Sequence, residues 1–378
     1  MNATARRHWT RVRRRAVAGG SAACYVCLVL LLSFLRQPAD DLSSQEPDAV
    51  WNGCAVEMAG AAGDVLGLAF SPDGTMLAAG SRDGTVRLWN PVTGENTASL
   101  RGHTAPVSAL AFSPDGTALT TGSWDEASLL WDTATGRITR TLGGPAFTRL
   151  APYREDDPHT HVFTAMAVSA DGGMLATGTG EGTIRLLDPA TGSDEASLFP
   201  NLPHSRLVLS APNSHNGLAF SPDGTLLAAG SRDGTVRLWD LASNEAIAAI
   251  VQAHVNADPV VAFSPDGTML AIGWNGGGRI LLWSPTTQKV MSTLRGHVEL
   301  LLAMVFDPGG ATLATASENG TVRLWNPTTG ENTSFSLGDR VHLQAAAFSR
   351  DGTMLATGAA DGKVRVWNRE RCQASSKK

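Results

Sequence analysis

Hydrophobic and polar residues alternate in short runs along most of the chain, and the runs recur in a fixed order. In the first unit, residues 65–70 alternate, a polar turn follows, residues 76–80 form an apolar run, and residues 85–89 alternate up to a tryptophan. A fourth alternating run covers residues 97–100. Period-two alternation bounded by Gly, Asp and Pro turns is typical of β-strands. Each unit therefore predicts four short antiparallel strands.

The unit occurs seven times. Its marker phrase, AFSPDGT in the best-preserved copies, places a glycine at Gly74, Gly116, Gly172, Gly224, Gly267, Gly310 and Gly352. These glycines are 42, 56, 52, 43, 43 and 42 residues apart, so insertions at roughly residues 145–160 and 201–213 flank the third unit. Because one such sheet cannot bury both of its apolar faces alone, the sheets should stack and close into a ring. We predict an all-β, seven-bladed β-propeller of four-stranded antiparallel blades.

The third strand of each unit carries the most specific signature. GSRDGTVRLWN at 80–90 returns as GSRDGTVRLWD at 230–240 and as ENGTVRLWN within the sixth unit. The marker tryptophans are Trp89, Trp131, Trp239, Trp283, Trp325 and Trp367, and the third unit has Leu187 instead. On these residues the chain resembles the WD-repeat β-propeller family, whose period is about 40 to 45 residues.

The last unit stops after its third strand, at residues 363–367. Residues 54–58 lie where a fourth strand belongs, because aligning the first unit with the second places Met58 on Leu100. We therefore expect the N-terminal strand to complete the last blade, which removes two sheet edges.

Two cysteines lie near this predicted junction. In the same alignment Cys54 matches Asn96 and Cys372 matches Gly94, which are two positions apart in an unbroken blade. That spacing is within reach of a disulfide, which would require an oxidising compartment. The alternative is two unrelated free thiols.

Charge is distributed unevenly. The net charge of the chain is −5, but seven arginines precede the first acidic residue, Asp40. The rest of the chain has 23 basic and 35 acidic residues and therefore a net charge of about −12. A nucleic-acid partner is not expected, because phosphate binding relies on clustered Lys and Arg.

Residues 16–35 contain no charge and are about as long as a membrane-spanning helix requires. The arginines before them should stay on the cytoplasmic side and place an anchored propeller outside the cytoplasm. A cleaved signal peptide, giving a secreted propeller, is a second interpretation. A misassigned start or a buried helix, with a cytoplasmic propeller, is a third.

We divide the chain into a basic segment (1–15), the apolar N-terminal helix (16–35), a linker (36–50), the propeller (51–372) and a tail (373–378).

Some residues have the types found in catalytic or metal sites. His103, Asp125 and Trp131 superficially suggest a triad. In the family that the chain resembles, these positions form a structural hydrogen-bond network inside the blade, and we interpret them so. His159 and His161 follow two aspartates but have no defined set of metal ligands around them. We expect no enzyme activity, no cofactor and no bound metal.

The resemblance also implies where a partner binds. In the family, partner contacts lie just before the Asp of the second turn and at the start of the first strand, all on the narrow face of the propeller, where we expect the partner to bind. The matching candidates here are Arg82, Trp124, Arg232, Trp274, Glu318, Asp64, Ser108, Leu300, His342 and Gln344. Arg and Trp are frequent interface anchors.

We expect a monomeric, non-enzymatic scaffold or receptor-like module for a protein or peptide partner. The alternative is a small-ligand or metal-dependent site at the channel mouth, formed by the insertions around the third blade.

Overall fold

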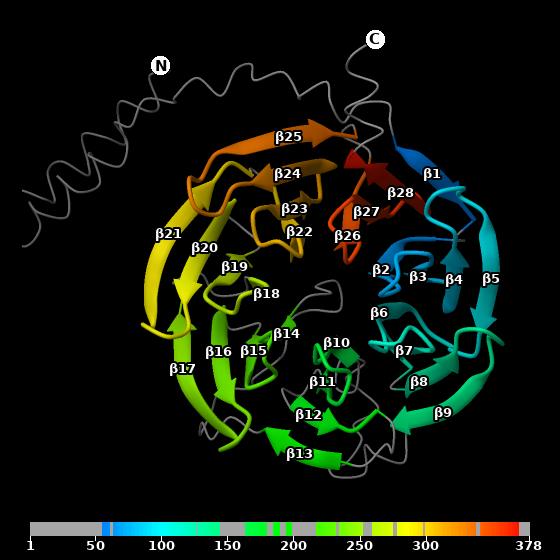
Figure 1. The fold of residues 1–378 in the computed structure, drawn as a ribbon, viewed down its shortest axis with the longest axis horizontal. Helices are drawn as coiled ribbons and strands as arrows, with labels where there is room; N and C mark the ends of the chain where they lie inside the picture. The colour runs from blue at the N-terminus through cyan, green and yellow to red at the C-terminus, as the bar shows by residue number, and fades with distance from the viewer. Residues whose placement is uncertain are drawn as a thin grey trace, which may run out of the picture. The chain divides into compact units, whose positions relative to one another are not determined.

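A computed structural model of the protein describes residues 55–60, 63–125, 127–143, 163–179, 184–189, 194–198, 217–231, 234–251, 259–274, 278–297, 299–337 and 341–369. These residues all belong to one of the two compact units of the chain, Pro47–Lys378. They form seven four-stranded antiparallel sheets (Figure 1). The predicted all-β, seven-bladed propeller is therefore confirmed.

Each blade has the same order of strands from the centre outward. The innermost strands are β2 (Val65–Phe70), β6 (Val107–Phe112), β10 (Phe163–Val168), β14 (Leu218–Phe220), β18 (Pro259–Phe263), β22 (Leu301–Phe306) and β26 (Leu343–Phe348). The second strands are β3 (Leu77–Ser81), β7 (Ala118–Ser123), β11 (Leu175–Thr179), β15 (Leu226–Gly230), β19 (Leu270–Trp274), β23 (Leu313–Ser317) and β27 (Met354–Ala359).

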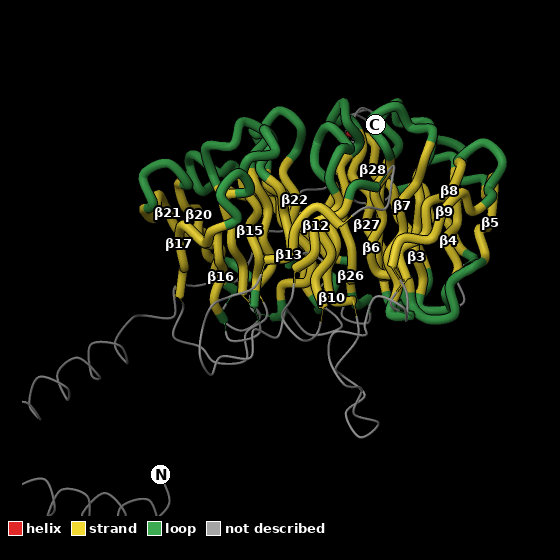
Figure 2. The backbone as a smooth tube through the Cα atoms, turned by 90° about the horizontal axis from the view of Figure 1, so that it is seen from below, coloured by secondary structure: helices red, strands yellow, loops and turns green. Residues whose placement is uncertain are grey.

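The third strands are β4 (Thr85–Trp89), β8 (Ala127–Asp132), β12 (Ile184–Leu187), β16 (Thr235–Asp240), β20 (Arg279–Ser284), β24 (Thr321–Trp325) and β28 (Lys363–Asn368). The outermost strands are β5 (Asn96–Arg101), β9 (Ile138–Gly143), β13 (Asp194–Leu198), β17 (Glu245–Val251), β21 (Lys289–Arg295), β25 (Asn332–Ser336) and β1 (Val56–Ala59). Contacts between successive innermost strands run around the whole ring and return from β26 to β2. Seen from the side, the strands extend from one loop-bearing face to the other (Figure 2).

The hydrophobic core lies between the blades. One cluster joins Met58 of β1 and Val364 of β28 with Val65, Leu77 and Trp89 of the next blade. Burial of apolar surface on both faces of every sheet is what holds neighbouring blades together.

Small residues in the second strands set the spacing between blades. A Cβ added to Gly80 would lie 2.7 Å from the carbonyl oxygen of Val107 in the next blade. Larger side chains at this position would therefore force the two blades apart.

The SPDG phrases form the tight turns that their composition predicts. In the first blade Gly74 has a φ of 71°, a conformation that favours glycine. The carboxylate of Asp73 accepts hydrogen bonds from the Ser71 hydroxyl at 2.5 Å and from the Thr75 N–H at 3.0 Å. These bonds, led by that from Ser71, lower the pKa of Asp73. The same turn in other blades uses Asp115, Asp171, Asp223, Asp266 and Asp351.

The ring is closed by the N-terminal strand. β1 pairs antiparallel with β28, and Met58 lies opposite Val364, as Leu100 lies opposite Val86 in the first blade. The predicted closure and its register therefore match the structure.

An ion cluster spans this junction. Glu57 accepts hydrogen bonds from Lys363 Nζ and Arg365 Nε, both at 2.9 Å. The bond from Lys363 lowers the pKa of Glu57 most strongly. Burial opposes this, and the bond from Arg365 adds to the lowering, so the pKa is lowered overall.

We expect Glu57→Gln to lower the free energy of unfolding by about 0.5 kcal/mol, because partly exposed ion pairs contribute only modestly. The loss should shrink in 1 M salt, since salt screens exposed charges. Urea unfolding at low and high salt measures both effects. Glu95→Gln, which removes an equal charge from an exposed turn, is the control. Equal losses in the two variants, or a loss that salt does not change, would contradict the role of the ion cluster.

The predicted N-terminal apolar helix, residues 16–35, lies outside the described residues. Within the described ranges, no helix has the length and apolar character needed to cross a membrane.

Candidate functional site

One face of the propeller carries a repeated backbone frame. We call it the entry face, because there the chain enters each innermost strand and the second strand turns into the third. In four blades the N–H groups of Arg82, Trp124, Glu318 and Ala360 donate to the carbonyl oxygens of Asp64, Pro106, Leu300 and His342, at 2.9, 3.0, 2.9 and 2.8 Å. Contacts of β22 with β26, β26 with β2 and β2 with β6 make these four blades consecutive in the ring. A uniform frame thus holds side chains of different chemistry.

In the first two blades this frame carries a cation beside an aromatic ring. Arg82 Nε lies 3.0 Å from Asp64 Oδ2, and the Arg82 side chain remains 50% exposed. The Arg82 guanidinium carbon lies 6.0 Å from the centre of the Trp124 ring, which is within cation–π distance. The sequence named all three residues separately, and the structure brings them together.

The sixth blade carries acidic and apolar side chains instead, and the seventh carries a histidine. Glu318 Oε1 lies 3.8 Å from His342 Nδ1, and the two side chains are 42% and 49% exposed. Leu300 is 37% exposed, and Glu299 beside it is also exposed.

Other predicted partner residues lie elsewhere. Trp274 is only 5% exposed, and its Nε1 donates to the carbonyl oxygen of Gly234 at 2.9 Å. The prediction of Trp274 as an exposed anchor is therefore wrong, because β19 continues through this residue and turns its indole into the core. Ser108 is 6% exposed within β6, which also removes it from the candidate surface. Gln344 is half-buried in β26, and Arg232 lies outside the described residues.

The second blade contains the predicted network, with Thr121 at its centre. His103 Nδ1 lies 3.0 Å from Asp125 Oδ2, and His103 Nε2 lies 2.8 Å from Thr121 Oγ1. Trp131 Nε1 donates to the same Thr121 oxygen at 2.8 Å. Burial opposes ionisation of Asp125, but hydrogen bonds from His103 and the Thr104 N–H lower its pKa overall. The His103 side chain is fully buried, so these groups hold the blade together.

The sixth blade has the same network without its carboxylate. His297 Nε2 lies 2.7 Å from Thr315 Oγ1, to which Trp325 Nε1 donates at 2.8 Å. Asn319 stands at the turn position of Asp125, and its Oδ1 accepts from Ser317 and from the Thr321 N–H. Burial, and then the positive charge of Arg323, lowers the pKa of His297 to about 3.

Four other blades, the first, third, fourth and fifth, contain only one member of the Thr–Trp pair. The seventh has both Thr357 and Trp367, but the Thr357 hydroxyl has no partner among the described residues. Trp89 and Trp239 have buried Nε1 groups without an acceptor among the described residues, because Ala79 and Ala229 occupy the position of Thr121. In the third blade Thr177 occupies that position, and Leu187 replaces the tryptophan. The Thr177 hydroxyl is accordingly buried without a partner in the described part of the chain.

We expect Ala79→Ser to raise the free energy of unfolding by about 1 kcal/mol, because the new hydroxyl gives the buried Trp89 N–H an acceptor. Ala229→Ser should do the same for Trp239. Ala78→Ser, on the other face of β3, adds a buried hydroxyl away from the unpaired Trp89 N–H and should lower the free energy of unfolding. Urea unfolding of the three variants measures this. A loss of stability in both of the first two variants would refute the proposed acceptor position.

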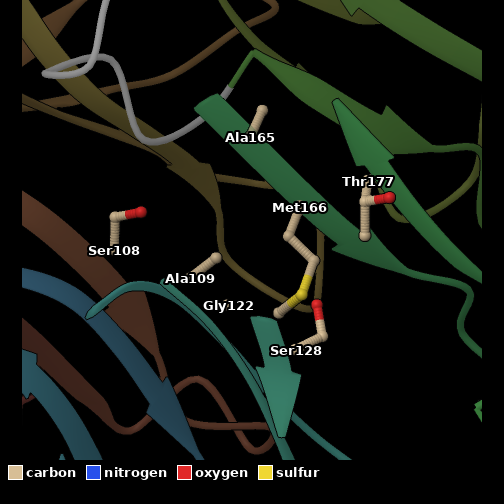
Figure 3. A pocket seen from close by; sticks show the side chains of 7 residues that line it. All are labelled: Ser108, Ala109, Gly122, Ser128, Ala165, Met166 and Thr177. Atoms are coloured by element: carbon tan, nitrogen blue, oxygen red, sulfur yellow. The ribbon is translucent and has the colours of Figure 1, made fainter. Parts of the chain in front are cut away.

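A narrow crevice between blades two and three is lined by residues of both (Figure 3). Met166 of β10 reaches toward Gly122, where an added Cβ would lie 3.1 Å from the Met166 sulfur. The hydroxyls of Ser128 and Thr177 face this space and have no hydrogen-bond partner among the described residues. The crevice is too tight to admit a water molecule, so it is a packing defect and not a ligand site.

Several predictions concern residues outside the described ranges: Cys54, Cys372, His159, His161 and both insertions around the third blade. In the described residues, no group of three or more His, Cys, Asp or Glu side chains is arranged to hold a metal ion.

Comparison with known proteins agrees with the geometry. The family described as "WD domain, G-beta repeat" matches residues 53–90, 94–132, 152–188, 204–240, 288–326 and 338–368. WD repeat and SOCS box-containing protein 1 from Mus musculus is 38% identical over 85 residues, which are 22% of this chain and 18% of that protein. Nuclear distribution protein PAC1 from Gibberella zeae is 34% identical over 178 residues, 45% of this chain and 36% of that protein.

The first of these similarities spans less than a fifth of the relative's length, and the second less than two fifths. Shared activity is therefore not implied by them. The family matches, in contrast, cover more than half of the chain and include the three inner strands of six of the seven blades. The chain belongs to the WD40-repeat family.

Proposed function

We propose that this protein is a non-enzymatic interaction module that binds a protein or peptide partner on its entry face. The observation that carries the proposal is the repeated backbone frame, which presents Arg82, Trp124, Glu318 and His342 from rigid strand ends. Side chains on a rigid scaffold lose little conformational entropy on binding, and exposed Arg and Trp often dominate interface energies. Propellers of this family typically serve as scaffolds for protein–protein interaction.

Affinity capture from the native host tests the proposal. We expect wild-type protein to retain a specific partner that Arg82→Ala and Trp124→Ala each lose. Arg137→Ala removes an exposed arginine from a turn on the opposite face and should leave capture unchanged. A partner lost equally in all three variants, or in none, would refute binding at the entry face. Unchanged circular dichroism spectra are needed to show that each variant is folded.

We further propose, on the sequence pattern alone, that residues 16–35 anchor the chain in a membrane and place the propeller outside the cytoplasm. The intact mass of the native protein, before and after reduction with thiol alkylation, tests this. Retention of residues 1–36, with two thiols that alkylate only after reduction, would support an outward-facing propeller with a Cys54–Cys372 disulfide. Alkylation of all cysteines without reduction would overturn the disulfide and favour an intracellular propeller, and loss of residues 1–36 would overturn the anchor.

A further inference from the structure

We propose that the entry face of blades six, seven, one and two binds an extended peptide segment with an acidic side chain at one end and a basic side chain at the other. The proposal rests on the function proposed above and adds the chemistry of the partner. It follows from the side chains that the shared backbone frame presents in these four blades.

The end formed by the first two blades suits a carboxylate. Asp64 binds only Nε of Arg82, and the two terminal nitrogens of Arg82 make no hydrogen bond or ion pair with the described residues. The Trp124 ring lies against the guanidinium and limits its freedom. A planar guanidinium with two free terminal nitrogens can donate two parallel hydrogen bonds to one carboxylate. Asp64 orients the arginine for this purpose.

The end formed by the sixth blade suits a basic side chain. Glu318 and Glu299 are both exposed there, and neither lies within ion-pair distance of a Lys or Arg among the described residues. The basic group that lies beside Glu318 in the described part of the chain is His342, with its Nδ1 3.8 Å from Glu318 Oε1. Exposed Leu300 beside them offers apolar surface to the methylene chain of a lysine or arginine.

Apart from His342, which lies beside Glu318, the seventh blade between the two ends presents little charge of its own to a ligand. Its turn carries Ala360, whose side chain is a single methyl group. The charged residues that follow are already engaged, Asp361 with Arg365 and Lys363 with Glu57. Opposite charges therefore stand at the two ends of the arc, with a nearly neutral segment between them.

This arrangement fixes the direction of the bound segment. With the acidic residue at Arg82 and the basic residue at Glu318, both ends are complementary. The reversed segment would place its basic residue at Arg82 and its acidic residue at Glu318. Repulsion between like charges would then disfavour this orientation at both ends.

A library of random linear peptides, selected for binding to the full chain, tests the inference. We expect wild-type protein to select peptides with an acidic and a basic residue at a constant spacing. These peptides should bind Arg82→Glu about tenfold more weakly or worse, and copies with the acidic residue replaced by lysine should regain binding to that variant. Arg137→Glu, the same reversal on the opposite face, should leave binding unchanged.

The outcomes separate the inference from the proposed function. Selected peptides that need Trp124 but show no acid–base pair, or no rescue by the lysine copies, overturn the inference and leave the entry face as a binding surface. Selection that yields no peptide dependent on Trp124 or Arg82 overturns the proposed function as well.

Discussion

Thr121→Val is expected to lower the free energy of unfolding by about 3 kcal/mol, although valine has nearly the same shape as threonine. The Thr121 hydroxyl binds both His103 Nε2 and Trp131 Nε1 at 2.8 Å. The substitution leaves these two buried groups without a partner, and each costs about 1 to 3 kcal/mol. Urea unfolding followed by tryptophan fluorescence measures the loss.

The third blade provides the matched control. Thr177 occupies the equivalent position but is buried without a partner among the described residues. Thr177→Val should therefore raise the free energy of unfolding by about 1 kcal/mol, since it removes a buried polar group that makes no hydrogen bond. Losses of equal size in the two variants would show that shape, and not hydrogen bonding, decides the stability at this position.

Stability is also expected to fall by about 2 kcal/mol between pH 7 and pH 5 because of His297 alone. In the folded protein, burial and the nearby Arg323 lower the pKa of His297 to about 3. In the unfolded chain the pKa is about 6.5. Between these two values the unfolded chain binds one more proton, so the stabilising contribution is complete above about pH 6.5 and declines as the pH falls.

Two variants isolate this effect in urea unfolding at pH 7, 6 and 5. His297→Gln removes the titrating ring and should flatten the dependence. Asn319→Asp should recreate the carboxylate that the second blade places beside its histidine, raise the pKa of His297 and reduce the slope. The pKa itself can be followed by NMR. Wild-type and His297→Gln curves of equal slope would show that the proton uptake occurs elsewhere.

Most of the fold was predictable because its information is local and repeated. Period-two alternation, the SPDG turns and the recurring tryptophan mark each strand separately, and the position of Met58 sets the register of the closing strand. A single odd insertion was enough to defeat this reasoning. The fifth unit has one extra residue at 273–279, which left the place of Trp274 ambiguous. The register of the strands puts Trp274 at the position of the buried Ser81, one residue before that of Arg82.

The candidate site was predictable in composition but not in its pairings. Arg82, Asp64 and Trp124 are far apart in the chain or lie in different blades, so no sequence spacing reveals that they touch. Thr121 and Thr315 were missed because threonine in a strand carries no signal of its own. Comparing the units column by column could have found them, since Thr and Trp recur together in the second, sixth and seventh units.

The pairing of β1 with β28 also determines when this protein can finish folding during synthesis. Lys363 and Arg365 contact Glu57 across 306 and 308 residues of sequence. β1 can therefore pair only after β28 has been made, and until then a ribosome-bound chain leaves the last blade without its outermost strand. Such distant contacts fold slowly and leave edges open to wrong pairing. The synthesis of β28 thus decides whether a nearly complete arc of blades becomes a ring.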